Sequence, residues 1–279
     1  MSHSYSLAYL TSNTLTPAQA IQLAAELGYR FVGLRLVPNA AGAPQQALIG
    51  RPDMLRETLA VQRDTGVGVF DLEIIRIGED FDPRASLPLL ETGAALKAKA
   101  VLVAGDDADP ARLADSYARL CELMLPYGMT ADLEFMPWTA VPDARTALGI
   151  VDAAGRPANA GILADALHVA RSGTTFDDLR ALPRELLHYA QICDAPASAH
   201  LGRAFTVEEM IHTARCERLL PGEGGIDLKG LFAALPADLP VSVEVPHDIR
   251  LPQVGQTGWA RQALAASRAV LEPGASSTQ

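Results

Sequence analysis

One pattern runs through the whole chain: a short apolar run is followed by a segment with apolar residues at helical spacing, and the pair then recurs. The 279-residue sequence contains eight such strand-like runs and about eight helical segments. The runs are continuously apolar rather than alternating, as expected for parallel strands buried on both faces. Eight strand–helix units in a chain of this length predict a (β/α)8 TIM barrel in a single domain, with its active site at the carboxyl ends of the strands.

The predicted elements follow from these runs and from Pro and Gly at helix ends. Strands are expected at 5–9, 31–36, 67–75, 100–104, 129–134, 161–165, 186–192 and 241–245. Helices are expected at 18–27, 52–65, 83–97, 109–125, 142–153, 166–171, 176–182, 227–235 and 257–271. The barrel domain is placed at 1–272, followed by a disordered polar tail at 273–279. A Gly-, Ala- and Pro-rich loop at 38–49 is long enough to lie over the barrel mouth. No element is assigned to the long segment at 194–225.

An open, doubly wound sheet is the alternative architecture. A dinucleotide-binding sheet of that kind carries GxGxxG after its first strand. Here the first predicted strand runs into Tyr-Leu-Thr-Ser-Asn-Thr at 9–14, which has no glycine. The barrel is therefore favoured.

Composition restricts the partners and the compartment. The formal net charge of −10 argues against a nucleic-acid surface, which needs a basic stripe. The three cysteines form no CxxC pair, as expected for free thiols in a reducing compartment. Neither a secretion signal nor an apolar run of membrane-spanning length is apparent. We therefore expect a cytoplasmic protein with no nucleic-acid or membrane partner.

Four oxygen-bearing side chains each close a strand-like run: Glu134, Asp165, Gln191 and Glu244. Any one of them alone would more often be a solvated strand end. In a parallel barrel, however, the carboxyl ends of the strands meet at one mouth. Three carboxylates and an amide oxygen suit a hard divalent cation, which would also compensate their charge. Together they predict a metal site.

Other side chains near the predicted strand ends are candidates for substrate binding. His168 follows Asp165 by one helical turn, so it would hydrogen-bond a substrate hydroxyl or carry a proton, or else cap a carbonyl. Trp138 would stack on a sugar face or simply pack. Arg35, at the end of the second strand, would bind a carboxylate or phosphate, or pair with an acid such as Glu73.

These residues occur in motifs that resemble those of the xylose isomerase-like TIM-barrel family over essentially the whole chain. The family contains sugar and sugar-phosphate isomerases and epimerases, and also 3-dehydroshikimate and keto-inositol dehydratases. The motifs are Leu133-Glu-Phe, Leu163-Ala-Asp-Ala-Leu-His168, Tyr189-Ala-Gln-Ile-Cys-Asp194, Leu220-Pro-Gly-Glu-Gly-Gly225 and Val243-Glu-Val-Pro246.

The resemblance implies a divalent ion (Mn, Mg, Co or Zn, with Mn favoured) held by the four strand-end residues, with His168 beside the substrate. Many members have His where this chain has Gln191. The resemblance also implies a substrate-binding arginine in the long loop after the seventh strand, where Arg203 is favoured over Arg218. Homo-oligomers are frequent in the family, although no interface is apparent from this sequence.

The implied chemistry begins with an α-hydroxy carbonyl substrate that chelates the ion, which acidifies the adjacent C–H. Glu134 and Glu244 would flank the reacting carbon, one removing the proton and the other returning it. We therefore expect a metal-dependent isomerase or epimerase that acts on a small polyol, sugar or keto acid through an enediolate. A dehydratase would start in the same way and then expel a β-hydroxyl group.

Two further hypotheses belong to other classes. Hydrolysis of abasic DNA, known on the same barrel, needs a histidine-rich multi-zinc cluster and is disfavoured by the acidic charge and the scarcity of histidines at strand ends. A binding protein with an idle metal site would bind metal without turnover.

Overall fold

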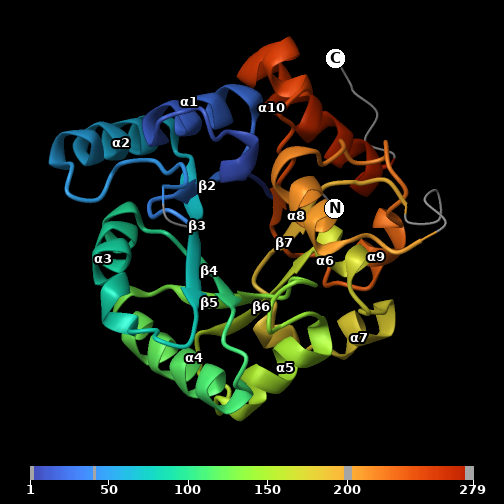
Figure 1. Ribbon diagram of the computed structural model, residues 1–279. Coiled ribbons are helices and arrows are strands. Elements are labelled where there is room, and N and C mark those ends of the chain that lie inside the picture. The colour runs from blue at the N-terminus through green and yellow to red at the C-terminus, as the bar shows by residue number, and fades with distance from the viewer. Residues whose placement is uncertain (1–2, 40–41, 198–202, 274–279) are drawn as a thin grey trace.

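The computed structural model describes residues 3–39, 42–197 and 203–273 (Figure 1). Eight parallel strands form a closed barrel in which each strand pairs with its neighbour in sequence, and β8 pairs with β1. This confirms the predicted (β/α)8 barrel. The predicted tail at 273–279 lies outside the described residues from position 274 onward.

The helices form a ring outside the strands (Figure 1). The strands are β1 (Tyr5–Leu7), β2 (Phe31–Arg35), β3 (Gly68–Ile77), β4 (Ala100–Gly105), β5 (Thr130–Glu134), β6 (Ala160–Asp165), β7 (Ala190–Ile192) and β8 (Val241–Val243). The helices are α1 (Pro17–Leu27), α2 (Pro52–Thr65), α3 (Leu87–Leu96), α4 (Pro110–Met124), α5 (Ala144–Ala153), α6 (Ala166–Arg171), α7 (Phe176–Ala181), α8 (Val207–Cys216), α9 (Leu228–Ala233) and α10 (Arg250–Leu271).

Side chains at the helix ends explain several of these boundaries. Thr16 and Gln19 form a capping box at the start of α1, and Gly28 ends that helix in the left-handed conformation. Asp109 accepts the N–H groups of Ala111 and Arg112 at the start of α4. Among the described residues, no helix is long and apolar enough to cross a membrane.

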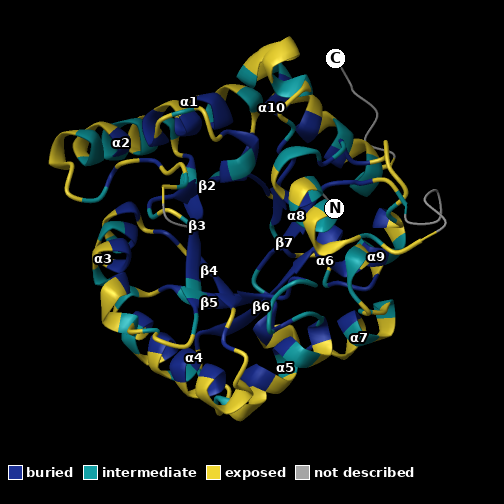
Figure 2. Cartoon of the chain, in the orientation of Figure 1, coloured by how far each residue is buried: buried dark blue, intermediate teal, exposed yellow. Residues whose placement is uncertain are grey.

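Burial follows the expected layering. The strands are almost entirely buried, and the helices turn a buried face inward and an exposed face outward (Figure 2). Trp259, on the inner face of α10, is fully buried and donates its indole N–H to the carbonyl oxygen of Val245 at 2.7 Å. This hydrogen bond fixes α10 beside Val245, the residue that follows Glu244.

The barrel interior also contains buried carboxylates, and glycines make room for them. A Cβ at Gly33 would come within 2.9 Å of the Asp71 carboxylate, and a Cβ at Gly161 within 2.2 Å of Asp132 Oδ1. Asp132 pairs with His188 at 2.7 Å, whereas neither oxygen of Asp71 has a hydrogen-bond partner in the described structure. These close approaches require a residue without a side chain.

Several predicted boundaries differ from the structure, and one helix was missed. The seventh strand was expected at 186–192, but 184–186 forms a 3-10 turn and the strand is confined to Ala190–Ile192. Helix α8 was not predicted, and α10 begins at Arg250 rather than at 257, with a kink at Gly255. The kink divides two helical segments, of which only the longer second one had a clear apolar period.

Candidate active site

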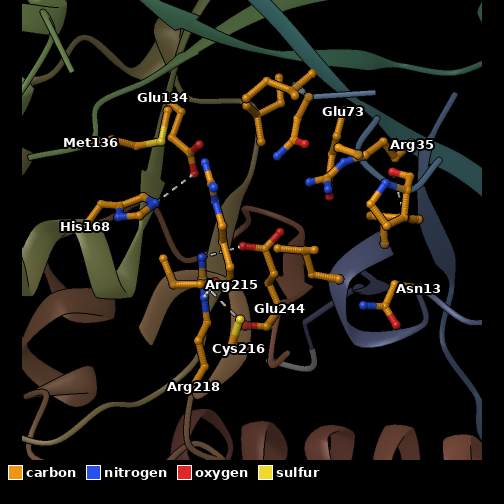
Figure 3. A pocket seen from close by; sticks show the side chains of 18 of the residues that line it. Asn13, Arg35, Glu73, Glu134, Met136, His168, Arg215, Cys216, Arg218 and Glu244 are labelled. Atoms are coloured by element: carbon orange, nitrogen blue, oxygen red, sulfur yellow. Dashed lines mark hydrogen bonds and ion pairs between the residues drawn. The ribbon is translucent and has the colours of Figure 1, made fainter. Parts of the chain in front are cut away.

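A cavity of about 340 Å³ lies at the carboxyl ends of the strands (Figure 3). This volume falls within the range of small-molecule sites. The cavity is bordered by strand ends and by the last turn of α8, and its polar lining includes Arg35, Glu73, Glu134, His168, Arg218 and Glu244.

The barrel brings the four predicted ligands to this end from four consecutive strands. Glu134 ends β5, Asp165 ends β6, Gln191 lies in β7, and Glu244 directly follows β8. Gln191 Nε2 donates to Glu244 Oε1 at 3.1 Å. One ligand atom each from Glu134, Asp165 and His168 lies within 4.8 Å of the others. The four residues therefore converge on one region.

Asp165 has a different partner on each oxygen. Its Oδ1 atom accepts the backbone N–H groups of Leu167 at 2.7 Å and His168 at 3.2 Å, which caps the first turn of α6. Its Oδ2 atom lies 2.5 Å from Nη1 of Arg218. The cap fixes the direction of α6, so His168 faces the cavity beside Glu134, with Nε2 3.6 Å from Glu134 Oε1.

Arg218 joins two of the candidate ligands. Its Nη1 and Nη2 atoms lie 2.5 Å from Asp165 and 2.7 Å from Glu244 Oε2, and the side chain is 2% exposed. The backbone N–H of Arg218 donates to the carbonyl oxygen of Pro246, and Nε donates to that of Ala214. The guanidinium is thus held by the chain after β8 and by α8.

The carboxylates remain short of positive charge despite this arginine. Burial raises the pKa of Glu134 well above its usual range, and the charges of Asp165 and Glu244 raise it further. Burial likewise raises the pKa of Glu244 to about 8, although Arg218 opposes the shift. Burial also tends to raise the pKa of Asp165, but Arg218 and His168 outweigh it and the pKa is lowered.

His168 is a neutral base in this environment. Burial lowers the pKa of its imidazole to about 4. Its Nδ1 atom is buried without a hydrogen-bond partner in the described structure. A neutral imidazole can accept or donate a hydrogen bond, so His168 can bind a hydroxyl group without adding a charge.

The residues present fit a divalent cation. Gln191 Oε1 is buried and has no hydrogen-bond partner among the described residues, although its amide nitrogen is satisfied. Glu134, Asp165 and Glu244 carry three negative charges when ionised, and Arg218 compensates one of them. The remaining two charges equal those of one divalent ion, and carboxylate, amide and imidazole donors suit Mg, Mn or Zn.

The other predicted binding residues divide into two groups. Trp138 lines the cavity and packs edge to face against His168, with ring centroids 5.0 Å apart. Arg35 also lines it and donates to Glu73 Oε2 at 2.7 Å. Arg203 is not among the lining residues: it is exposed and pairs with Glu209 in the first turn of α8 at 2.6 Å.

The resemblance favoured Arg203 over Arg218, whereas the structure places Arg218 between Asp165 and Glu244. Two features of the sequence could have indicated Arg218. The pattern Thr206-x-x-Glu209 is a capping box, and it indicates a helix that starts there and ends just before Arg218. Arg218 also stands next to the apolar pair Leu219-Leu220, as expected for a segment packed against the barrel.

The closed parallel barrel and the carboxylate cluster at its catalytic end define a TIM-barrel protein with a candidate metal centre. The chain belongs to the family of xylose isomerase-like TIM barrels, whose model matches residues 21–270.

Similar proteins include members with different activities. A 3-dehydroshikimate dehydratase of Pseudomonas aeruginosa is 30% identical over 144 residues, which are 50% of this chain but 21% of that protein. The structure of the IOLI protein with a bound zinc atom has a TM-score of 0.73 at 18% identity, covering 98% of this chain and 100% of that one. D-allulose 3-epimerase from Methylomonas sp. in complex with D-allulose has a TM-score of 0.68 at 16% identity, covering 96% of this chain and 97% of that one.

Proposed function

We propose that this protein is a divalent-metal-dependent isomerase or epimerase of a sugar, a sugar phosphate or a related α-hydroxy carbonyl compound. The observation that carries the proposal is the set of three buried carboxylates with one compensating arginine, beside a Gln191 oxygen that has no hydrogen-bond partner among the described residues. The family and its similarity to D-allulose 3-epimerase add support.

Glu134, Asp165, Gln191 and Glu244 would hold the metal, with His168 beside it. When bound there, a divalent ion polarises a substrate carbonyl and acidifies the neighbouring C–H. We favour Mn because the donors are mainly oxygen. The zinc atom in the IOLI structure supports a divalent ion on this type of barrel.

Proton transfer would be carried out by the two glutamates. Glu134 comes from β5 and Glu244 from the end of β8, so they approach the cavity from separate strands. One carboxylate would remove the proton next to the carbonyl and the other would return it to the same or the neighbouring carbon. Neutral His168 would hydrogen-bond a substrate hydroxyl group, and Trp138 and Arg35 would form parts of the cavity wall.

A dehydratase is the second candidate, favoured by the similarity to the Pseudomonas 3-dehydroshikimate dehydratase. The first step would be the same removal of a proton. The two reactions differ afterwards, because a dehydratase expels a β-hydroxyl group as water while an isomerase returns the proton. The residues that line the cavity are compatible with both reactions.

The test is proton exchange in deuterated water. Protein loaded with MnCl2 is incubated with D-allulose and other ketoses, and loss of the hydrogen next to the carbonyl is followed by NMR. We expect exchange with at least one sugar and its loss, by at least about a hundredfold, in Glu134→Gln. Formation of protocatechuate from 3-dehydroshikimate, read by ultraviolet absorbance, would instead establish the dehydratase. Metal-loaded protein that neither exchanges any of these hydrogens nor forms this product would overturn the proposal.

A further inference from the structure

The interior of the barrel below the cavity is polar on one side, although the side-chain layers inside such a barrel are usually filled by valine, isoleucine and leucine. Four adjacent strands contribute small or polar inward-facing residues there: Ser242 (β8), Ser6 (β1), Gly33 (β2) and Asp71 (β3). Ser6 and Ser242 are register partners, and each alternates with residues of the outer apolar core. Asp71 lies against Gly33, whose lack of a side chain makes room for the carboxylate. This part of the wall therefore presents oxygen atoms where apolar branches usually pack.

These oxygen atoms are buried and have no protein partner. The hydroxyl groups of Ser6, Ser242 and Tyr189 and both carboxylate oxygens of Asp71 form no hydrogen bond with any described residue, and all four residues are at most 1% exposed. Tyr189 belongs to the same interior, because its ring packs against that of Phe70 with centroids 5.0 Å apart. Burial raises the pKa of its hydroxyl well above the usual range, and the charge of Asp71 raises it further. Since buried polar groups are almost always satisfied, we expect a bound species among these oxygens.

The charge of Asp71 indicates what that species is. Burial raises the pKa of its carboxyl, and the negative charges of Glu244 and Asp132 raise it further. Asp132 is itself paired with His188 at 2.7 Å, whereas Asp71 has no such partner among the described residues. Water would satisfy hydrogen bonds but would leave the charge of an ionised Asp71 uncompensated. A proton removes the charge but supplies one donor, whereas a cation can be coordinated by all of these oxygen atoms together.

We propose that the barrel interior below the candidate metal centre binds a monovalent cation, sodium or potassium, among the oxygen atoms of Asp71, Ser6, Ser242 and Tyr189. One carboxylate and three neutral hydroxyl groups carry a single negative charge, which a monovalent ion balances and a divalent ion exceeds. Hard cations prefer oxygen ligands of this kind. Glu73, the next inward residue of β3, lines the cavity, so the site lies directly below the cavity floor. The site shares no ligand with the candidate metal centre, so the inference does not rest on the proposed function.

The first test is the dependence of stability on the salt that is present. Urea unfolding of EDTA-treated protein is measured at equal ionic strength in the chloride of sodium, potassium or N-methyl-D-glucamine, the last being too large for a buried site. The pH is 8, because burial raises the pKa of Asp71 to about 7 and the proton competes with the ion. With N-methyl-D-glucamine the proton is the remaining counter-charge of Asp71.

We expect sodium or potassium to lower the equilibrium constant of unfolding by at least about tenfold, as a folded-state site gives when the ion is at about ten times its Kd. The ion with the larger effect is the one that the site selects. Equal stability in the three salts, which a site occupied by water or by a proton alone would give, would overturn the inference.

Two variants show where the ion acts. Asp71→Asn keeps the size of the side chain but removes its charge, so it should abolish the salt dependence. Ser6→Ala removes one neutral oxygen and leaves every charge in place, so it should weaken the effect, whereas an ion held by the carboxylates of the candidate metal centre would not respond to it. The matched controls are Asp64→Asn, at an exposed position, and Ser116→Ala, at a buried position on α4; both should keep the full effect. An effect that either Asp71→Asn or Ser6→Ala leaves unchanged would overturn the inference.

Crystallography locates the ion without reference to stability. Thallium(I) has the charge of sodium and potassium and a strong anomalous signal. Crystals soaked in thallium(I) acetate should show an anomalous peak beside Asp71, which sodium or potassium should displace. Peaks confined to the candidate metal centre or to the protein surface would overturn the inference.

Discussion

A single side chain, Arg218, determines whether three buried carboxylates can coexist at the barrel mouth. It contacts Asp165 and Glu244 directly, and it also opposes the rise in the pKa of Glu134. Breaking a buried ion pair from one side leaves an uncompensated charge, which costs more than the pair itself contributes. Arg218 is therefore a structural cation of the metal-free protein.

Replacing this cation tests that role. In EDTA, Arg218→Met should lower the free energy of unfolding by about 3–5 kcal/mol because it leaves Asp165 and Glu244 buried and unpaired. MnCl2 should restore part of the loss. Urea unfolding with and without metal measures both effects. The control is Arg119→Met, whose exposed pair with Asp115 should contribute at most about 1 kcal/mol. Wild-type stability of Arg218→Met in EDTA would contradict this account.

Asp71 should produce a pH dependence of stability. Burial, aided by the charges of Glu244 and Asp132, raises the pKa of its carboxyl from 3.8 to about 7. The folded protein therefore keeps a proton that the unfolded chain releases, so stability should fall as the pH rises through this window and then level off. The full effect is at most about 4 kcal/mol.

Asp71→Asn cannot titrate and should remove this slope. The quantity to measure is the difference in unfolding free energy between wild type and Asp71→Asn in EDTA, determined by urea titration at several pH values between 5 and 8. As the pH rises, the unfolding free energy of the wild type should fall relative to that of Asp71→Asn. Asp64→Asn, at an exposed position, is the matched control for the substitution itself. A constant difference for Asp71→Asn would show that the carboxyl is not held protonated.

At the scale of elements, the sequence predicted what depends on neighbours in the chain. The apolar periods and end signals placed α2 at 52–65 and α6 at 166–171, which are the observed bounds. The prediction was wrong where contacts between residues far apart in the chain determine the boundaries of an element. β7 shortens to 190–192 because only Ala190 to Ile192 pair with β8, and the preceding residues turn away. Local apolarity cannot distinguish a paired residue from one that is merely buried.

The same division applies to the candidate site. The strand-end positions of Glu134, Asp165 and Glu244 could be predicted, because parallel strands bring their carboxyl ends together. The partner of two of them could not, because Arg218 reaches the centre through its pairing with Pro246 and through α8, a helix that periodicity did not reveal. A capping box alone marked that helix in the sequence.

At the scale of the whole molecule, closing the barrel around buried carboxylates depends on residues without side chains. At Gly161 an added Cβ would meet Asp132 Oδ1 at 2.2 Å and His188 Nδ1 at 2.5 Å, and these two atoms are themselves paired between β5 and the segment that precedes β7. The neighbours cannot move apart without breaking that pair inside a closed sheet. A side chain at Gly161 would therefore strain β6 together with β5 and the segment before β7.

Gly161→Ala should consequently destabilise the protein by about 1–3 kcal/mol, the usual range for overpacking a core. Gly149→Ala offers a matched control within α5, since its added methyl group would meet nothing within 4 Å. There the same substitution should stabilise by up to about 1 kcal/mol, because alanine favours helix and restricts the unfolded chain. Urea unfolding of both variants measures the change in unfolding free energy, which should have opposite signs in the two. If both substitutions changed stability in the same direction, the tight packing of the Asp132–His188 pair against β6 would not limit closure of the barrel.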